Sequence, residues 1–179
     1  AGAMRKFWID LGLTQKDISV PMSTLNSLNA KAVDAEAPRL SFVRNPRSIN
    51  LDISEIELTK VTLPIHPEHP EKGVREWPLE EGTINVKIDR DDFSTHEPKR
   101  LKDFADIGIH HEKTVKGWTG EVIRTERHGN TPIIHWLPSN MAQPAVLLLE
   151  EEGELVAAAG LLEVNDYSDG TVVQLERMG

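Results

Sequence analysis

The sequence predicts a mainly β protein in which antiparallel barrels follow a short helical segment. Apolar and polar residues alternate with a period of two in Ile56–Leu63 and again in Thr83–Asp89, the pattern of strands buried on one face. Short apolar runs recur further along the chain between polar, glycine-containing turns, as they do in antiparallel barrels. Helical spacing of apolar residues stands out in residues 1–36, ahead of these runs.

Two helices are expected at the start of the chain. Apolar residues recur at helical spacing from Met4 to Leu11, and Gly12 is a natural stop. The segment Thr14–Asp17 resembles an N-terminal cap with an acidic residue at its third position. A second helix is predicted from Met22 to about Glu36, and Pro38 ends it.

The proline-rich stretch Leu63–Trp77 separates the two alternating runs. Three prolines fix the backbone and remove donors, so neither a helix nor a central strand is expected, and we predict a rigid, extended joint between two strand systems. His66 and His69 lie three residues apart, a spacing that serves a shared metal on a helix. Because no helix is expected, we interpret both as surface imidazoles on a stiff linker.

The remaining strands are short. The segment Asn45–Ser48 is predicted as a break, and the acidic residues Glu150–Glu154 as a solvated hairpin turn. The strand-like segments besides the two alternating runs are Leu40–Val43, Ile49–Ile53, Arg100–Ile109, Glu121–Arg124, Ile133–Leu137, Ala145–Leu149, Leu155–Leu161 and Thr171–Leu175.

Composition limits the class of function. The chain of 179 residues has no cysteine, which excludes disulfides and thiolate metal sites. Its 29 acidic and 20 basic residues give a net charge of −9, which argues against non-specific binding of polyanions. No apolar run reaches about 18 residues and no leader is recognisable, so we expect a soluble, cytoplasmic protein. No phosphate-binding loop or nucleophile elbow occurs.

Arginines stand at strand starts and ends beside small or polar residues. A planar guanidinium presents several donors and stacks on bases, so this placement suits the reading of unstacked nucleotides. The alternative is that each arginine is a solvated charge at the rim of the fold. The arginines concerned are Arg39, Arg44, Arg47, Arg100 and Arg177.

Five motifs in order resemble the C-terminal anticodon-binding region of the glutamyl/glutaminyl-tRNA synthetases, with the archaeal-type glutamyl enzyme as the most similar branch. They are Asp34–Arg39, His66–Gly73 with Arg75, Ile88–Phe93, Ile134–Trp136 and Val173–Arg177. A short segment from Asp92 to Arg100 and an aspartate at position 34 favour the glutamyl branch over the glutaminyl one.

The resemblance implies two β-barrels, similar to those of ribosomal 5S-rRNA-binding proteins, behind a helical connector. We expect the connector at residues 1–37, a proximal barrel at 38–74 plus 150–179, and a distal barrel at 75–149. The parent enzyme would attach glutamate to tRNA-Glu with ATP and magnesium, and whether it also charges tRNA-Gln is left open. The nucleotide-binding signatures of such class I enzymes are absent from this chain, so we expect no catalytic site, metal or cofactor within it.

The same resemblance implies anticodon-binding residues. Arg39 corresponds to a base-contacting arginine, Arg100 to a basic residue at the first anticodon base, and Gln174 and Arg177 to residues at the second and third bases. Contacts to the tRNA backbone are expected from Arg44, Arg47 and Lys102.

Three other functions were weighed. A β-barrel pair with an acidic surface could dock another protein, and a free-standing barrel could bind ribosomal RNA. The second of these has no need for the connector helices. A small hydrolase using His66 and His69 is disfavoured because no further ligand cluster accompanies them.

Overall fold

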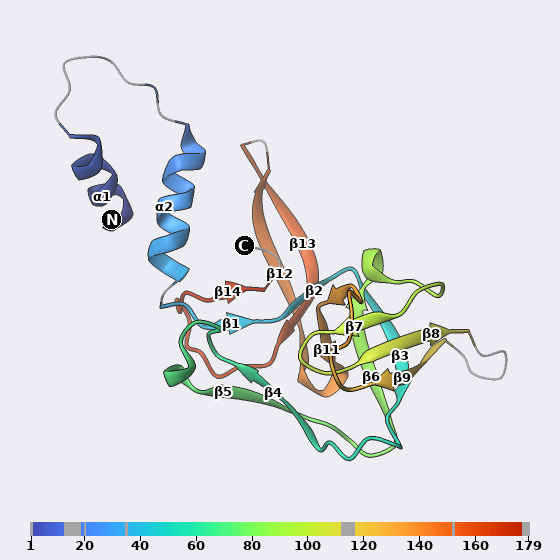
Figure 1. The fold of residues 1–179 in the computed structure, drawn as a ribbon. Helices are drawn as coiled ribbons and strands as arrows, with labels where there is room; N and C mark the ends of the chain where they lie inside the picture. The colour runs from blue at the N-terminus through green and yellow to red at the C-terminus, as the bar shows by residue number, and fades with distance from the viewer. Residues whose placement is uncertain are drawn as a thin grey trace.

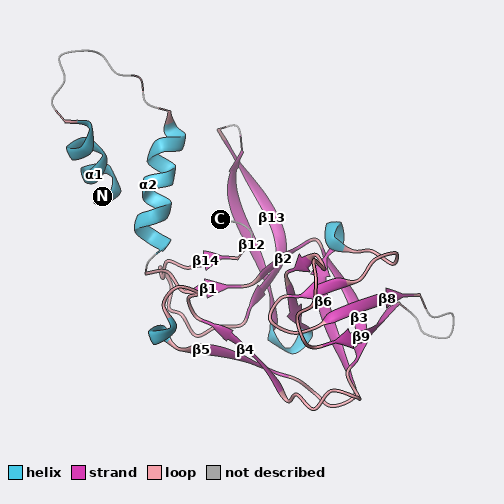
Figure 2. Ribbon diagram, viewed as in Figure 1, coloured by secondary structure: helices cyan, strands magenta, loops and turns pink. Residues whose placement is uncertain are grey.

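A computed structural model describes residues 2–12, 19, 21–34, 36–111, 117–151 and 153–176. The chain is mainly β, with two helices beside each other at one side of the strands (Figures 1 and 2). These helices are α1, Gly2–Leu11, and α2, Met22–Asp34. Both were predicted from the spacing of apolar residues.

The helix ends follow from local chemistry. Gly12 adopts a φ of 69°, which a residue without a Cβ reaches easily, and this ends α1 as predicted. The α2 helix ends at Asp34, two residues before the predicted end. Phe7 is buried, whereas Met4 and Trp8 of the same predicted apolar stripe stay exposed. The cap predicted at Thr14–Asp17 lies outside the described residues.

One seven-stranded sheet organises the β structure. Its order is β10-β7-β8-β9-β3-β6-β11, and the two outer strands are separated in sequence by the single residue His135, so the sheet nearly closes on itself as a barrel. Its strands are β3 Pro46–Asp52, β6 Thr83–Asp89, β7 Lys99–Leu101, β8 Asp106–His110, β9 Trp118–Arg124, β10 Ile133–Ile134 and β11 Trp136–Pro138.

Three smaller sheets accompany it. The long hairpin β12–β13 (Ala142–Glu151 and Glu154–Glu163) pairs with β2 (Phe42–Arg44), so residues far apart in sequence share one sheet. The remaining two sheets are pairs: β4 with β5 (Lys60–Pro64 and Val74–Pro78), and β1 with β14 (Arg39–Leu40 and Gln174–Leu175). Figure 1 shows the end of the chain returning to the strands that follow α2.

The hydrophobic core fills the seven-stranded sheet and continues under the β4–β5 pair. Burial alternates along β6 as its sequence predicted, with the apolar residues inside. Trp77 of β5 and Trp136 of β11 meet edge to face with ring centroids 5.2 Å apart, which joins the two sheets through their largest side chains. Fully buried members of this core include Ile49, Leu51, Val86, Ile88, Leu101, Ile107 and Leu137.

The proline-rich stretch is not the extended joint that its sequence predicted. The β4 and β5 strands pair antiparallel, and the chain between them turns back through a short 3-10 helix at Pro70–Lys72. Pro70 stands at the first position of this helix, where its missing N–H costs nothing, and Gly73 adopts a φ of 89° as the chain enters β5.

This reversal also corrects the interpretation of His66. Its side chain is fully buried rather than exposed, because the returning chain lies against the end of α2. Two strand boundaries differ as well. Within Ile56–Leu63 only the part from Lys60 onward is strand, and β3 begins at Pro46, inside the predicted break. A proline is tolerated as the first residue of a strand.

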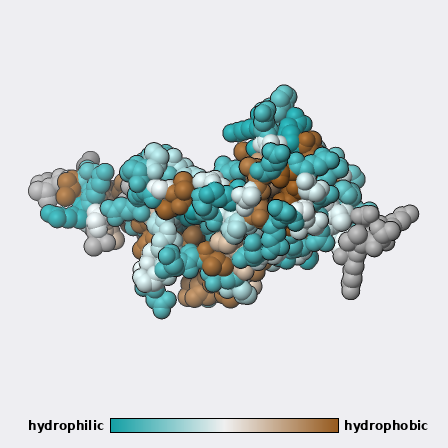
Figure 3. All heavy atoms as spheres, turned by 90° about the horizontal axis from the view of Figure 1, so that it is seen from below, coloured by the Kyte–Doolittle hydropathy of each residue, from teal (hydrophilic) through white to brown (hydrophobic). Residues whose placement is uncertain are grey.

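Among the described residues one nearly closed sheet is shown, and the second predicted barrel is not. The β3 strand, which comes from the region predicted as the proximal barrel, shares the seven-stranded sheet with strands from the distal region. The division of the chain into three domains therefore stays a prediction. Figure 3 shows a largely hydrophilic face with apolar groups in small areas. Neither described helix is long and apolar enough to cross a membrane.

Gly160 allows β13 to approach β2. A Cβ at this position would press on the Phe42 ring and lie 2.6 Å from Val43 O, a backbone atom that cannot swing away. We therefore expect Gly160→Ala to lower the free energy of unfolding by about 2–3 kcal/mol, the scale of core overpacking. Chemical denaturation followed by tryptophan fluorescence measures this.

Gly2→Ala is the matched control, since a Cβ there meets nothing within 4 Å. Equal stability of the two variants would contradict the tight approach of β13 and β2.

Candidate nucleic-acid interface

Two of the predicted anticodon-binding residues are brought together by the pairing of β1 with β14. The strands run parallel, and Arg39 and Gln174 are direct partners in the register. The Gln174 N–H donates to Pro38 O at 2.9 Å, and the Glu176 N–H donates to Leu40 O at 2.9 Å. Arg177, another of the four predicted residues, lies outside the described part of the chain.

A groove of about 610 Å³ lies between α2 and the segment that leads into β14. Polar groups face it from both walls. Gln174 Oε1 is buried, and no hydrogen-bond donor reaches it from any described residue. A buried carbonyl oxygen without a donor is costly. The lining residues are Asn26, Asn29, Ala30, Lys31, Val33, Asp34, Val172, Val173 and Gln174.

Arg39 does not line this groove itself, but Asp34, which does, holds its guanidinium. Its Nη2 donates to Asp34 Oδ1 at 2.6 Å, and the Arg39 side chain keeps 12% of its surface exposed. The hydrogen bond from Arg39 lowers the pKa of Asp34 below its usual value. In the described part of the chain Asp34 is the only hydrogen-bond partner of the guanidinium, which leaves further N–H groups for a ligand.

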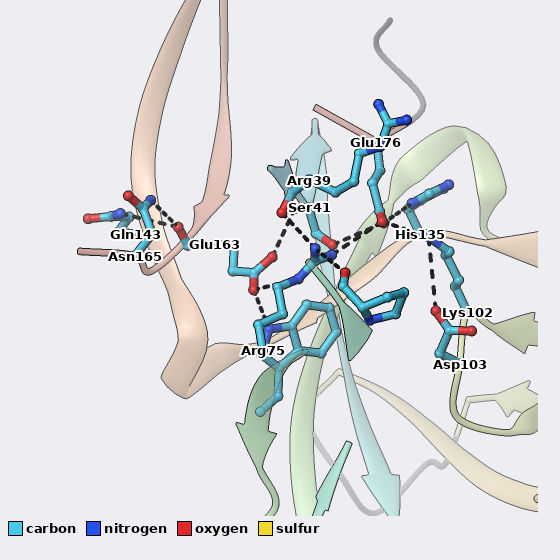
Figure 4. Close-up of polar contacts among 12 residues, drawn as sticks. Arg39, Ser41, Arg75, Lys102, Asp103, His135, Gln143, Glu163, Asn165 and Glu176 are labelled. Atoms are coloured by element: carbon cyan, nitrogen blue, oxygen red, sulfur yellow. Dashed lines mark hydrogen bonds and ion pairs between the residues drawn. The ribbon is translucent and has the colours of Figure 1, made fainter. Parts of the chain in front are cut away.

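Beneath this pair, Arg75 lies between two buried carboxylates (Figure 4). Its Nε is 3.0 Å from Glu163 Oε1, and its Nη2 is 3.2 Å from Glu176 Oε1. Its Nη1 donates to Arg39 O at 2.6 Å and to Pro64 O at 3.1 Å. One guanidinium of β5 thus fixes the backbone of β1, the end of β4 and the acidic side chains of two later segments.

The two carboxylates have pKa shifts in opposite directions. Burial raises the pKa of Glu163, although Arg75 and hydrogen bonds from the Ser41 N–H and Trp77 Nε1 oppose it. Burial also acts to raise the pKa of Glu176. There His135, Lys102 and the charge of Arg75 together outweigh burial, and the pKa lies well below its usual value.

Lys102 and His135 connect this cluster to the seven-stranded sheet. Lys102, in the turn after β7, donates from Nζ to Glu176 Oε1 at 2.7 Å. His135, between β10 and β11, places Nδ1 3.4 Å from Glu176 Oε2, a long ion-pair contact. The Lys102 side chain remains 31% exposed, and its contact with RNA backbone stays a prediction.

Arg100 is not near the groove. Its guanidinium is buried in the seven-stranded sheet, where it contacts Asp106 Oδ1 at 3.1 Å and three carbonyl oxygens, those of Phe104, Thr125 and Glu126. These bonds brace the chain on either side of β8 and β9. A base contact from Arg100 would have to compete with them.

Arg44 and Arg47 do not line the groove either. The Arg47 guanidinium lies over the ring of Phe93, with Cζ 4.2 Å from its centroid, and 5.6 Å from that of Trp118. Such stacking is a cation–π contact. Arg44, in β2, is partly exposed. In the described ranges no three histidines or carboxylates lie close enough to hold a metal ion.

Sequence reasoning missed the residues that support the groove. Asp34 was noted only as a departure from the family pattern, and Glu163, Glu176 and Arg75 were given no structural role. A signal did exist for Glu163, which ends a long apolar strand that otherwise predicts a buried segment. A carboxylate in such a place needs a buried partner.

Comparisons with known proteins identify the family of the chain. A family described as "tRNA synthetases class I (E and Q), anti-codon binding domain" matches residues 37–128, more than half of the chain. The chain belongs to this family. The match begins two residues before Arg39 and ends after Arg100 and Lys102, so it includes five of the seven predicted RNA-binding residues; Gln174 and Arg177 lie outside it.

Relatives extend the likeness over the whole chain. Glutamate–tRNA ligase of Pyrococcus furiosus is 33% identical over 99% of this chain, and that of Thermoplasma volcanium is 34% identical over 98%. The Methanosarcina barkeri ligase is 31% identical over all of it. The chain spans about 30% of the length of these curated relatives, corresponding to their C-terminal region.

The lowered pKa of Glu176 predicts a pH dependence of stability. A carboxyl whose pKa is lowered by folding stabilises the fold above its usual pKa, near 4.5, and this contribution is lost as the pH falls. We expect Glu176→Gln to lower the free energy of unfolding by about 3 kcal/mol at pH 7. Below pH about 4.5, the free energy of unfolding of this variant should fall less steeply than that of the unmodified protein. Urea denaturation at a series of pH values from about 3 to about 7, on both sides of the usual glutamate pKa, measures both effects.

Glu57→Gln is the control, because Glu57 is an exposed carboxylate. Parallel stability curves for the unmodified protein and Glu176→Gln would show that Glu176 has no special stabilising role.

Proposed function

We propose that this chain is the anticodon-binding region of a glutamyl-tRNA synthetase, and that the groove between α2 and β14 receives an unstacked anticodon base. The observation that supports this most is the pairing of Arg39 with Gln174 beside that groove. The family membership and the glutamate–tRNA ligases among the relatives support the class of ligand.

The chemistry of the groove fits a nucleobase. Single-stranded RNA is read through unstacked bases whose Watson–Crick edges offer both donors and acceptors. Arg39 supplies planar donors, and Gln174 supplies a carbonyl oxygen that accepts and an amide that donates. Asp34 holds the guanidinium in one orientation, which limits the bases that fit. Arg177, next in sequence to Glu176, is proposed as a further base contact.

A local site of this kind explains how an acidic protein can bind RNA. With a net charge of −9, the chain is poorly suited to extended phosphate contacts. Arg44, Arg47 and Lys102 remain proposed for a few such contacts. We assign Arg100 a bracing role instead, because its bonds lie within the protein. A second barrel and the three-domain division also remain proposals.

The parent enzyme would supply the rest of the reaction. Its other two-thirds would activate glutamate with ATP and magnesium in the cytoplasm and transfer it to tRNA-Glu, while α1 and α2 link that part to the groove. Acceptance of tRNA-Gln would depend on how strictly the third anticodon base is read. The chain itself would bind and discriminate without catalysing.

Protein docking is a second candidate function, favoured by one observation. Val146, Leu148 and Leu155 are exposed on one face of the β12–β13 hairpin, where a partner protein could cover them. If this is the function, changes in the tRNA anticodon would not alter the affinity of the chain for tRNA.

Binding of the anticodon stem-loop of tRNA-Glu tests the proposal. We expect Arg39→Ala and Gln174→Leu each to weaken binding by about 5- to 150-fold, equivalent to about 1–3 kcal/mol for a lost base contact. If the residue contacts a base, the loss of affinity caused by its substitution should be smaller for a loop in which that base is replaced. Loss of a phosphate contact would instead weaken binding of all loops equally. Fluorescence anisotropy at low salt, with each anticodon base replaced in turn, measures this.

Arg90→Ala is the matched control, since it removes an exposed arginine at the end of β6, in a different sheet from β1 and β14. Equal affinity of the unmodified protein for all anticodons, or equal losses in Arg39→Ala and Arg90→Ala, would contradict base reading at this groove.

A further inference from the structure

His66 is buried at the junction between α2 and the β4–β5 turn. Its Nε2 lies 2.6 Å from Asp34 O, and the Glu68 N–H donates to its Nδ1 at 3.1 Å. A carbonyl oxygen only accepts, so Nε2 must carry the hydrogen, while Nδ1 must be free of one to accept. The two neighbours therefore select a single tautomer of the ring.

The bond from His66 caps the helix. Asp34 is the last residue of α2, and its carbonyl is among those that find no partner inside the helix. A second anchor lies nearby, where Lys72 Nζ donates to Glu36 O at 3.1 Å. Both anchors come from the turn between β4 and β5.

Asp34 has a second contact, made by its side chain. Its carboxylate binds Arg39 at 2.6 Å while its carbonyl binds His66. One residue thus connects a buried ring to the guanidinium beside the groove. A shift of the Asp34 backbone would move its carboxylate, and the Arg39 guanidinium bonded to that carboxylate would move with it.

In the described part of the chain, the main packing partner of α2 is α1 rather than a strand. Figure 1 shows α2 standing away from the sheets with its C-terminal end nearest β1 and β14. Because α2 forms one wall of the groove, its position at that end sets the groove width.

We propose that His66 is a positioning residue for base recognition, acting through Asp34 on Arg39 and on the width of the groove. This inference rests on the proposed function, since it assigns His66 to the reading of an anticodon base. His66 touches no RNA in this role. It holds the residues that do.

Two substitutions separate the two bonds of the ring. In His66→Asn the side-chain oxygen occupies the region of Nδ1 and can still accept from Glu68, but the side chain is too short to reach Asp34 O. In His66→Gln the amide N–H extends toward the position of Nε2 and can donate to Asp34 O. His66→Asn therefore removes the contact with the helix and His66→Gln keeps it, while both variants carry an amide side chain.

The binding experiment compares the two variants in the 179-residue chain, using the anticodon stem-loop of tRNA-Glu and loops with single anticodon replacements. We expect His66→Asn to reduce discrimination between these loops about five- to tenfold, the scale of one lost hydrogen bond. His66→Gln should stay within about threefold of the unmodified protein. Equal losses in both variants would overturn the proposal, because they would reflect burial rather than the bond to Asp34.

A measurement without RNA separates this inference from the proposed function. The NMR signal of the Arg39 Nε–H group should shift in His66→Asn and return in His66→Gln. If the unmodified protein shows no anticodon discrimination, the proposed function fails, and the Arg39 signal alone decides whether His66 positions this residue. An unmoved signal in His66→Asn overturns the inference.

Asp34→Asn covers the case in which His66→Asn does not fold. Its side chain is 38% exposed, so the fold should survive, while the charge that holds Arg39 is lost. We expect the same loss of anticodon discrimination. If Asp34→Asn discriminates between the loops as well as the unmodified protein does, the proposal that His66 acts on Arg39 through Asp34 is contradicted.

Discussion

The buried contact of Arg75 with Glu163 and Glu176 is the constraint on which the arrangement of strands depends. Removing a charge from water costs several kcal/mol unless it is paired and hydrogen-bonded. Each of these three groups therefore requires the others within about 3 Å, as is typical of charge-assisted hydrogen bonds. They come from β5, the end of β13 and the residue after β14, so satisfying them brings three distant segments together.

The groove is a consequence of this arrangement. Arg75 also holds Arg39 O, and Glu176 follows β14 directly, so the charged cluster fixes the two strands that carry Arg39 and Gln174. Lys102 and His135 then tie Glu176 to the seven-stranded sheet. With these contacts in place, the two strands beside the groove would need little further ordering when a ligand binds.

Local sequence patterns predicted the elements that depend on local chemistry. Period-two alternation identified β6, and helical spacing identified α1 and α2. The family motifs singled out Arg39 and Gln174, which the fold places opposite each other. The turn at Pro70, the burial of His66 and the pairs of Glu163 were missed. The turn at Pro70 is local and is closed by the pairing of β4 with β5. The other two arise from contacts between residues far apart in the chain, such as the 122 positions that separate Ser41 from Glu163. No window of sequence contains both partners.

The parallel pairing of β1 with β14 has a consequence for synthesis on the ribosome. Gln174 emerges long after Arg39, so one wall of the groove is missing while most of the polypeptide is already available to fold. A nascent chain can form the seven-stranded sheet, whose last strand ends at Pro138, before β14 can complete the groove. The groove is thus completed only after most of the polypeptide has been synthesised.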